Sequence, residues 1–161
     1  MIKYQTWAQT FSEVPDEISL YVPLANCTIH CEGCNSKWLW LDKGTELTEK
    51  EIQRLIDKNK GITCVCIGGG EGDFTSLNNI FRYIKEHNLK TCWYSGLDTI
   101  PKHIDIRNLD FIKIGHYNGT PINEEGTNQI FWKVEHYNHG FELINETQLF
   151  RKHIKNNSNE N

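Results

Sequence analysis

The sequence predicts an α/β domain built on a mostly parallel sheet, and three observations lead to this prediction. Short apolar or alternating segments typical of strands recur along the chain, and helical patterns separate the first of them. Turn residues, including a run of glycines, stand where these segments end. Strands that alternate with helices form βαβ units, whose crossovers make neighbouring strands parallel. At 161 residues the chain fits a single domain, expected over 1–150, followed by a flexible polar tail over 151–161.

The first half of the chain supplies a strand, a helix and a second strand. Apolar and polar residues alternate over 18–22, which predicts a strand. A helix is expected to begin after Thr48, because Thr48 and Glu51 match a capping box, and to end at Gly61. Residues 62–67 are mostly apolar and β-branched, which is typical of a buried strand.

The same order then repeats. A glycine-rich turn over 68–73 leads into a helix whose apolar residues recur at helical spacing until about Asn88. Three further strands are expected, over 91–94, 111–114 and 130–134. The pattern shows no helix between the last two, and 136–150 receives no assignment. The carboxyl ends of parallel strands meet at one edge of a sheet, so we expect the functional groups there.

Composition excludes several classes of protein. Hydrophobic residues make up 38% and charged residues 24%, values that do not fit disorder, collagen or a coiled coil. Seventeen Lys and Arg against 21 Asp and Glu give a net charge of −4, so no nucleic-acid partner is indicated. No segment approaches the roughly 18 consecutive apolar residues of a membrane span, and the N-terminus lacks the features of a signal peptide. We expect a soluble cytoplasmic protein with no membrane partner.

Three of the six cysteines form a Cys-x3-Cys-x2-Cys run at Cys27, Cys31 and Cys34. Three thiolates on one short loop can hold three corners of an iron–sulfur cube and leave its fourth iron free. The alternative is a zinc site, with His30 or a distant cysteine as the fourth ligand.

The other three cysteines fall in apolar segments. Cys64 and Cys66 are two apart in a predicted strand, so both face the same side of the sheet. We expect them to pack as small hydrophobic side chains. A second metal site or a redox dithiol remains the alternative.

The cysteine run resembles the signature of radical S-adenosylmethionine enzymes. The resemblance implies that Cys27, Cys31 and Cys34 bind a [4Fe–4S] cluster whose fourth iron chelates S-adenosylmethionine. It also implies an incomplete parallel (α/β) barrel. One departure is Asn26, because a glycine usually precedes the first cysteine in that superfamily.

The glycine-rich turn carries a second part of the resemblance. Gly69, Gly70 and Glu71 are similar to the Gly-Gly-Glu/Asp motif that contacts the methionine end of S-adenosylmethionine. Glycines in such a turn let the backbone approach a ligand closely. Ser95 matches a family position at a strand end, where it is either a cofactor contact or a simple turn residue.

The finer resemblance is to the activating proteins of anaerobic (class III) ribonucleoside-triphosphate reductases. It covers roughly residues 4 to 135 and depends on Gly33 and on the passages 13–17, 93–96, 112–115 and 126–129. It implies an oxidoreductase that cleaves S-adenosylmethionine and generates a glycyl radical on the large reductase subunit. The electron would come from a flavodoxin or ferredoxin, and a homodimer is compatible with the family. No catalytic residue beyond the cluster and cofactor sites is implied.

Two rival functions stay open on the sequence. One is another radical S-adenosylmethionine enzyme, which activates a different glycyl-radical enzyme or modifies a small molecule such as a deazapurine precursor. The other is a non-catalytic zinc or iron–sulfur interaction module.

Overall fold

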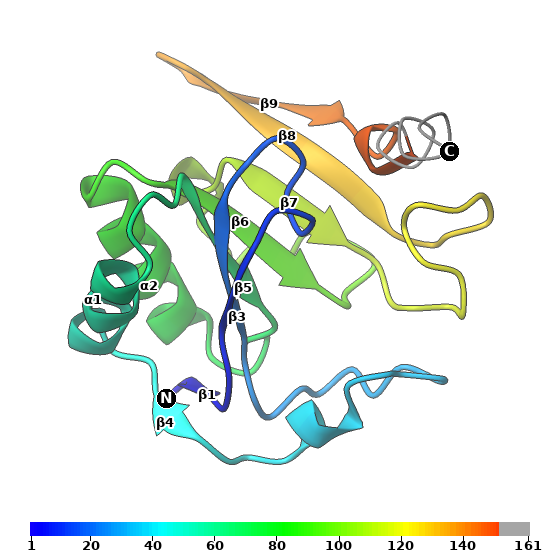
Figure 1. The fold of residues 1–161 in the computed structure, drawn as a ribbon. Coiled ribbons are helices and arrows are strands. Elements are labelled where there is room, and N and C mark those ends of the chain that lie inside the picture. The colour runs from blue at the N-terminus through cyan, green and yellow to red at the C-terminus, as the bar shows by residue number, and fades with distance from the viewer. Residues whose placement is uncertain (152–161) are drawn as a thin grey trace, which may run out of the picture.

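The computed structural model describes residues 1–151, in which two helices cover one face of a seven-stranded sheet (Figure 1). In spatial order the strands of this sheet are β2 (Ala8–Thr10), β3 (Ser19–Pro23), β5 (Cys64–Gly68), β6 (Lys90–Ser95), β7 (Phe111–Ile114), β8 (Ile130–Tyr137) and β9 (Gly140–Asn145). Outside it lie the strand pair β1 (Lys3–Tyr4) and β4 (Thr45–Glu46), the helices α1 (Glu49–Lys58) and α2 (Phe74–Glu86), and the 3-10 helices η1 (Lys37–Trp40) and η2 (Ile106–Asn108).

The centre of the sheet is parallel and its two sides are antiparallel. Strands β3, β5, β6 and β7 run parallel to one another. On one side β2 is antiparallel to β3, and on the other side β8 is antiparallel to β7 and β9 to β8. The incomplete parallel barrel expected from the sequence is therefore not what the structure shows. The physical reason lies in 115–129, which crosses from β7 to β8 without a helix, so that β8 returns antiparallel instead of adding another βα unit.

Helix α1 begins where the sequence places its cap, and α2 begins directly after the predicted glycine-rich turn. The Thr48 hydroxyl accepts a hydrogen bond from the Glu51 N–H at 3.1 Å, which confirms the predicted start of α1. The Asp73 carboxylate caps α2 in the same way. Helix α1 ends at Lys58, before Gly61, because Asn59 already has a non-helical backbone. The cap at Asp73 fixes the turn between β5 and α2.

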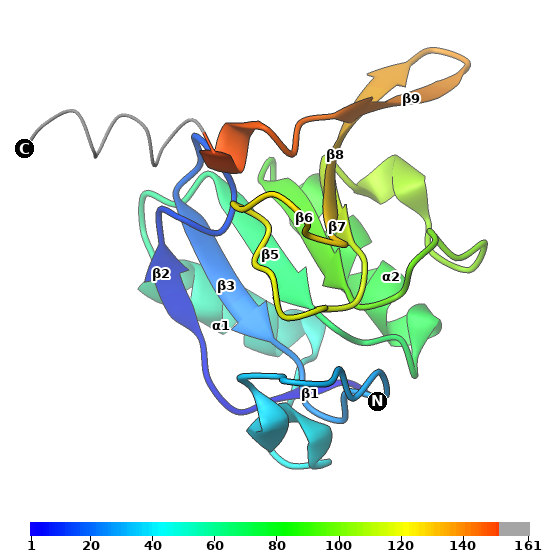
Figure 2. The same cartoon turned by 90° about the vertical axis from the view of Figure 1, so that its right-hand side faces the viewer.

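Apolar side chains pack on both faces of the sheet. The helix-side core includes the fully buried Trp93 of β6. On the opposite face Cys64, Cys66 and Cys92 pack with Phe131, so the prediction that Cys64 and Cys66 share a face is confirmed. The segment 115–129 (yellow) crosses in front of this second face (Figure 2). The sheet is thus enclosed by helices on one side and by loops on the other.

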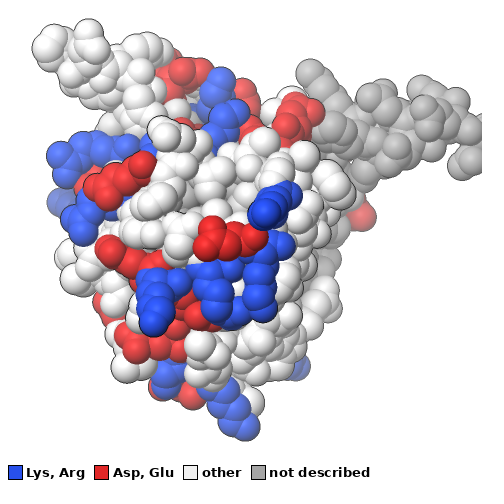
Figure 3. Space-filling model, turned by 60° about the vertical axis from the view of Figure 1, so that its left-hand side comes forward, with Lys and Arg blue, Asp and Glu red and all other residues white. Residues whose placement is uncertain are grey.

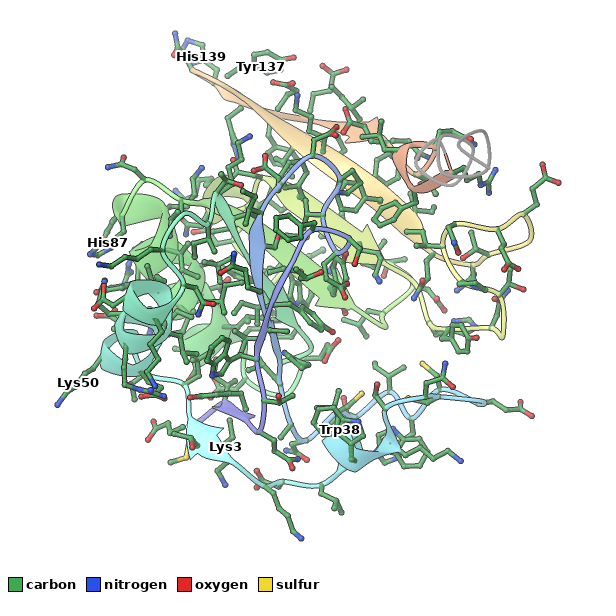
Figure 4. The ribbon with its side chains drawn as sticks, viewed as in Figure 1. Lys3, Trp38, Lys50, His87, Tyr137 and His139 are labelled. Carbon is green, nitrogen blue, oxygen red and sulfur yellow. The ribbon has the colours of Figure 1, made fainter. Side chains whose placement is uncertain are left out.

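Residues 136–150, unassigned from sequence, form the end of β8, the strand β9 and a turn. Tyr137 and His139 lie at the projecting tip of the β8–β9 hairpin (Figure 4). Most residues of β9 are exposed, so its sequence lacks the alternation that marks a half-buried strand. Of the tail expected over 151–161, all but Arg151 lies outside the described residues.

Charged side chains of both signs lie side by side on the surface seen in Figure 3. On the helices and the loops beside them they form pairs such as Arg54 with Glu51 and Lys85 with Asp110. Within residues 1–151, no helix has the length and apolar character needed to cross a membrane.

Replacing Gly115 by Ala should destabilise the fold strongly. Gly115 has a φ of +118°, and a Cβ there would lie 2.5 Å from the Asn128 carbonyl oxygen. We expect a loss of about 3 kcal/mol in the free energy of unfolding, from a strained φ together with a backbone clash. Urea unfolding measures the loss.

Gly119 supplies the matched control, because it has a φ of +94° but a Cβ there would meet nothing within 4 Å. Gly119→Ala should cost only about 1 kcal/mol. Equal losses in the two variants would show that the contact with Asn128 is unimportant.

Candidate functional site

A cavity of about 210 Å³ lies at the carboxyl ends of the four parallel strands. One wall is the loop after β3, which carries Cys27, Cys31 and Cys34, and the opposite wall comes from the ends of β5 and β6. Figure 1 shows this loop crossing beneath the sheet at that edge. The expected edge of the sheet therefore holds every predicted site residue except Gly70, because parallel strands bring their carboxyl ends together.

Backbone hydrogen bonds attach the base of the cysteine loop to the body of the protein. The Leu24 N–H donates to the Gly68 carbonyl at 2.8 Å, which joins the start of the loop to the end of β5. The Cys27 N–H donates to the Leu39 carbonyl at 2.9 Å, next to Trp38 of η1 (Figure 4). These bonds place the first cysteine directly over the strand ends.

The loop turns through three residues with positive φ, namely Asn26 (60°), His30 (51°) and Gly33 (73°). Asparagine tolerates the left-handed region better than most residues other than glycine. Residue 26 therefore has a backbone conformation that glycine adopts easily and asparagine tolerates, which explains why Asn26 can stand where a glycine is usual. His30 stacks on the Trp40 ring at 4.3 Å between centroids.

The three loop thiols are free, partly exposed and open to the same cavity. The Ser36 N–H donates a hydrogen bond to the Cys34 sulfur at 3.3 Å. Within residues 1–151, no three His, Cys, Asp or Glu side chains stand close enough together to hold a metal ion. The loop brings three soft ligands to one wall of the cavity, and a four-iron cluster, unlike a single ion, takes each of its thiolates on a separate iron.

The opposite wall is organised around the Glu71 carboxylate. The Ser95 hydroxyl donates to Glu71 Oε1 at 2.7 Å, and the Gly96 N–H donates to the same oxygen at 3.3 Å. The turn before it is held by two bonds at Gly69: its N–H donates to the Tyr94 carbonyl and its carbonyl accepts from the Trp93 indole, both at 2.8 Å. The second carboxylate oxygen of Glu71 has no hydrogen bond to any residue in 1–151.

The structure brings Gly69, Glu71 and Ser95 to the cavity but places Gly70 differently. Gly70 lines another hollow, near the N-terminus. A Cβ on Gly70 would meet the Leu24 side chain at 3.0 Å, so core packing, together with a φ of +86°, already requires glycine there. Close approach to a ligand is not needed to explain this residue.

The two walls also contact each other directly. A Cβ on Gly96 would lie 3.0 Å from the Ile29 side chain of the cysteine loop. The absence of a side chain at Gly96 therefore lets the loop pack against the end of β6. This contact sets the separation between the thiols and the Glu71–Ser95 pair.

Comparison with known families identifies residues 17–113 as a 4Fe-4S single cluster domain. The chain belongs to this family. It is accordingly an iron–sulfur protein, and the matched range contains the whole cysteine loop and the strands that support it. No curated protein matches the chain.

Membership of the 4Fe-4S single cluster family agrees with the chemistry of the loop. Thiolates are the ligands that such clusters require, and the loop thiols fit this requirement in type and accessibility. His30, the alternative zinc ligand, has its ring against Trp40. The family thus favours a [4Fe–4S] cluster over a zinc site.

The three remaining cysteines form part of the core. Cys64, Cys66 and Cys92 are fully buried in an apolar cluster, and burial raises the pKa of the Cys64 and Cys92 thiols well above its ordinary value. Protonated thiols are poor metal ligands. Their placement fits the expected role as small hydrophobic side chains.

Sequence reasoning assigned no role to several residues of the cavity, among them Tyr21, Tyr94 and Lys113. Lys113 was detectable in principle, since it is a lysine at an inward-facing position of an otherwise apolar strand. The two tyrosines gave no signal, because aromatic residues are common in strands that only pack.

Each of Cys27, Cys31 and Cys34 should be required for the cluster. After anaerobic reconstitution with iron and sulfide, Cys31→Ala should lose most of the visible absorbance of the wild-type protein, because only two thiolates remain. Cys64→Ala is the control and should keep it, because that thiol is buried away from the loop. Full absorbance in Cys31→Ala would contradict the assignment.

Proposed function

We propose that the protein is a radical S-adenosylmethionine activase that generates a glycyl radical on an anaerobic ribonucleoside-triphosphate reductase. The observation that carries the proposal is the single cavity with cluster-type thiols on one wall and the Glu71–Ser95 pair on the other. The proposal extends the family assignment with the resemblance of the cysteine and glycine motifs. A flavodoxin or ferredoxin is the proposed electron donor.

In this proposal Cys27, Cys31 and Cys34 hold the cluster and Glu71 holds S-adenosylmethionine. Since Ser95 and Gly96 occupy Oε1, the remaining carboxylate oxygen is free to accept a hydrogen bond from the ammonium of the methionine part. A cluster held by these three cysteines would supply the electron that cleaves bound S-adenosylmethionine and so starts the removal of a hydrogen atom from the target glycine. The chain's own residues bind, orient and shield these groups.

A protein substrate fits the open construction of the site. Beyond β7 the described chain adds only antiparallel strands, so no further βα units enclose the cavity. A glycine loop of another protein can enter from that side and reach the contact distance that hydrogen abstraction demands. A small substrate would instead require a more enclosed pocket.

Glu71→Gln should weaken S-adenosylmethionine binding roughly tenfold, because a charged acceptor becomes neutral while the hydrogen bond from Ser95 can persist. Calorimetric titration of the cluster-loaded protein measures this change. Glu86→Gln, on the exposed end of α2, is the control and should bind as the wild type does. Unchanged affinity in Glu71→Gln would remove Glu71 from the cofactor site.

The proposed reaction is tested by mixing reduced protein, S-adenosylmethionine and the candidate reductase without oxygen. Electron paramagnetic resonance should show a glycyl doublet that disappears when the target glycine of the reductase is changed to alanine. Cleavage of S-adenosylmethionine without such a doublet would assign the chain to another radical enzyme, acting on a different protein or on a small molecule. Absence of any cleavage would favour a non-catalytic iron–sulfur module.

A further inference from the structure

Lys113 occupies the floor of the cavity, on the face of the sheet away from the helices. In the ladder it pairs with Tyr94 of β6 on one side and with Phe131 of β8 on the other. Its strand neighbours Ile112 and Ile114 pack in the helix-side core, so the alternation of a strand turns Lys113 to the cavity.

The Lys113 ammonium makes no hydrogen bond or ion pair within residues 1–151. Its nitrogen lies 3.7 Å from the centroid of the Tyr94 ring, a cation–π contact that uses none of its three N–H donors. The Tyr21 ring lies next to Tyr94, with 6.0 Å between centroids. The ammonium therefore rests on an aromatic floor with its donors unused.

Removing an ammonium from water without a hydrogen-bond or ion-pair partner costs free energy. Burial lowers the pKa of Lys113 below its ordinary value, against the opposing effect of the Glu13 carboxylate nearby. An apolar residue at this position would avoid the cost. An ammonium that faces a cavity with three unused N–H donors is placed to bind an anion there.

The cavity has two charged side chains in its lining, Glu71 and Lys113. They lie at different positions along the strands. Glu71 is bound by Ser95, which pairs with Ile114, whereas Lys113 is one residue earlier in β7 and pairs with Tyr94. A phosphate carries up to two charges and is usually bound by several donors or by arginine. A single ammonium beside aromatic rings matches a single negative charge.

We propose that Lys113 binds a carboxylate of the substrate and thereby positions the substrate in the cavity. The proposal depends on the proposed function, and it narrows the protein substrate to a glycine segment with an acidic residue close to the target glycine. Lys113 is a substrate-binding residue, separate from the Glu71–Ser95 pair.

Peptide binding to the cluster-loaded protein, with S-adenosylmethionine present and no reductant, tests this role. The probes are acetyl-Gly-Asp-Gly-amide and its Asn counterpart, which differ in one carboxylate. The wild type should prefer the Asp peptide by about tenfold, the effect of one charged hydrogen bond. In Lys113→Met this preference should vanish, while thermal stability stays equal or rises because an unpaired charge has been removed.

Lys133→Met is the matched control, since Lys133 lies on the neighbouring strand and pairs with Glu135 at the surface. It should keep the preference for Asp. Acetate should compete with the Asp peptide, and inorganic phosphate should not compete better than acetate.

The proposal would be overturned by a wild type without preference for the Asp peptide, by a preference that survives in Lys113→Met, or by phosphate competing more strongly than acetate. Weaker S-adenosylmethionine binding in Lys113→Met would also overturn it, by assigning the ammonium to the cofactor. The peptide-binding experiment involves no turnover, so its result is independent of whether a glycyl doublet forms. The doublet experiment therefore tests the proposed function separately.

Discussion

The in-register pairing of the four parallel strands determines where every candidate group lies. Pro23 of β3 pairs with Gly68 of β5, which in turn pairs with Tyr94 of β6 and, through it, with Lys113 of β7. A shift of one residue in any of these pairs would turn the inward residues of that strand to the opposite face. The cavity exists because four strand ends stop at the same level.

Glycines at the strand ends leave room for side chains that pack around the cavity. Gly68 leaves space for the Tyr21 ring, whose hydroxyl would lie 3.2 Å from a Cβ there, and Gly96 leaves space for Ile29. The buried indole of Trp93 then fixes the turn at Gly69 from the helix side. Core packing and site geometry are therefore built from the same residues.

The sequence predicted the elements that have a local signal and missed those that depend on distant contacts. The cap at Thr48, the glycine-rich turn before α2 and the apolar strand β5 follow from neighbouring residues. The short strands β1 and β4 pair residues such as Lys3 and Glu46, far apart in the chain, so no local pattern marks them. The sheet in the structure is not a parallel barrel, because the connection 115–129 lacks a helix. In the sequence this connection is marked only by the lack of a helical pattern.

The same division holds for the site. The thiols belong to a compact motif whose spacing predicts a cluster site, and the Gly69–Glu71 turn was predicted from its resemblance to a short family motif. The floor of the cavity is made by residues from different strands, such as Tyr94 and Lys113, which only the sheet register brings together. Gly70 was predicted from its motif to contact a ligand, but a side chain there would meet Leu24 and Leu77 of the core.

The unequal burial of the six cysteines has a consequence for maturation. During delivery of iron and sulfide, the folded chain offers three accessible thiols on a single loop, while Cys64, Cys66 and Cys92 are enclosed by apolar side chains. Misincorporation of iron at the inner sulfurs would require the sheet to open. If the chain folds before iron is delivered, only the loop thiols are accessible to it, and the three buried cysteines cannot compete for the cluster.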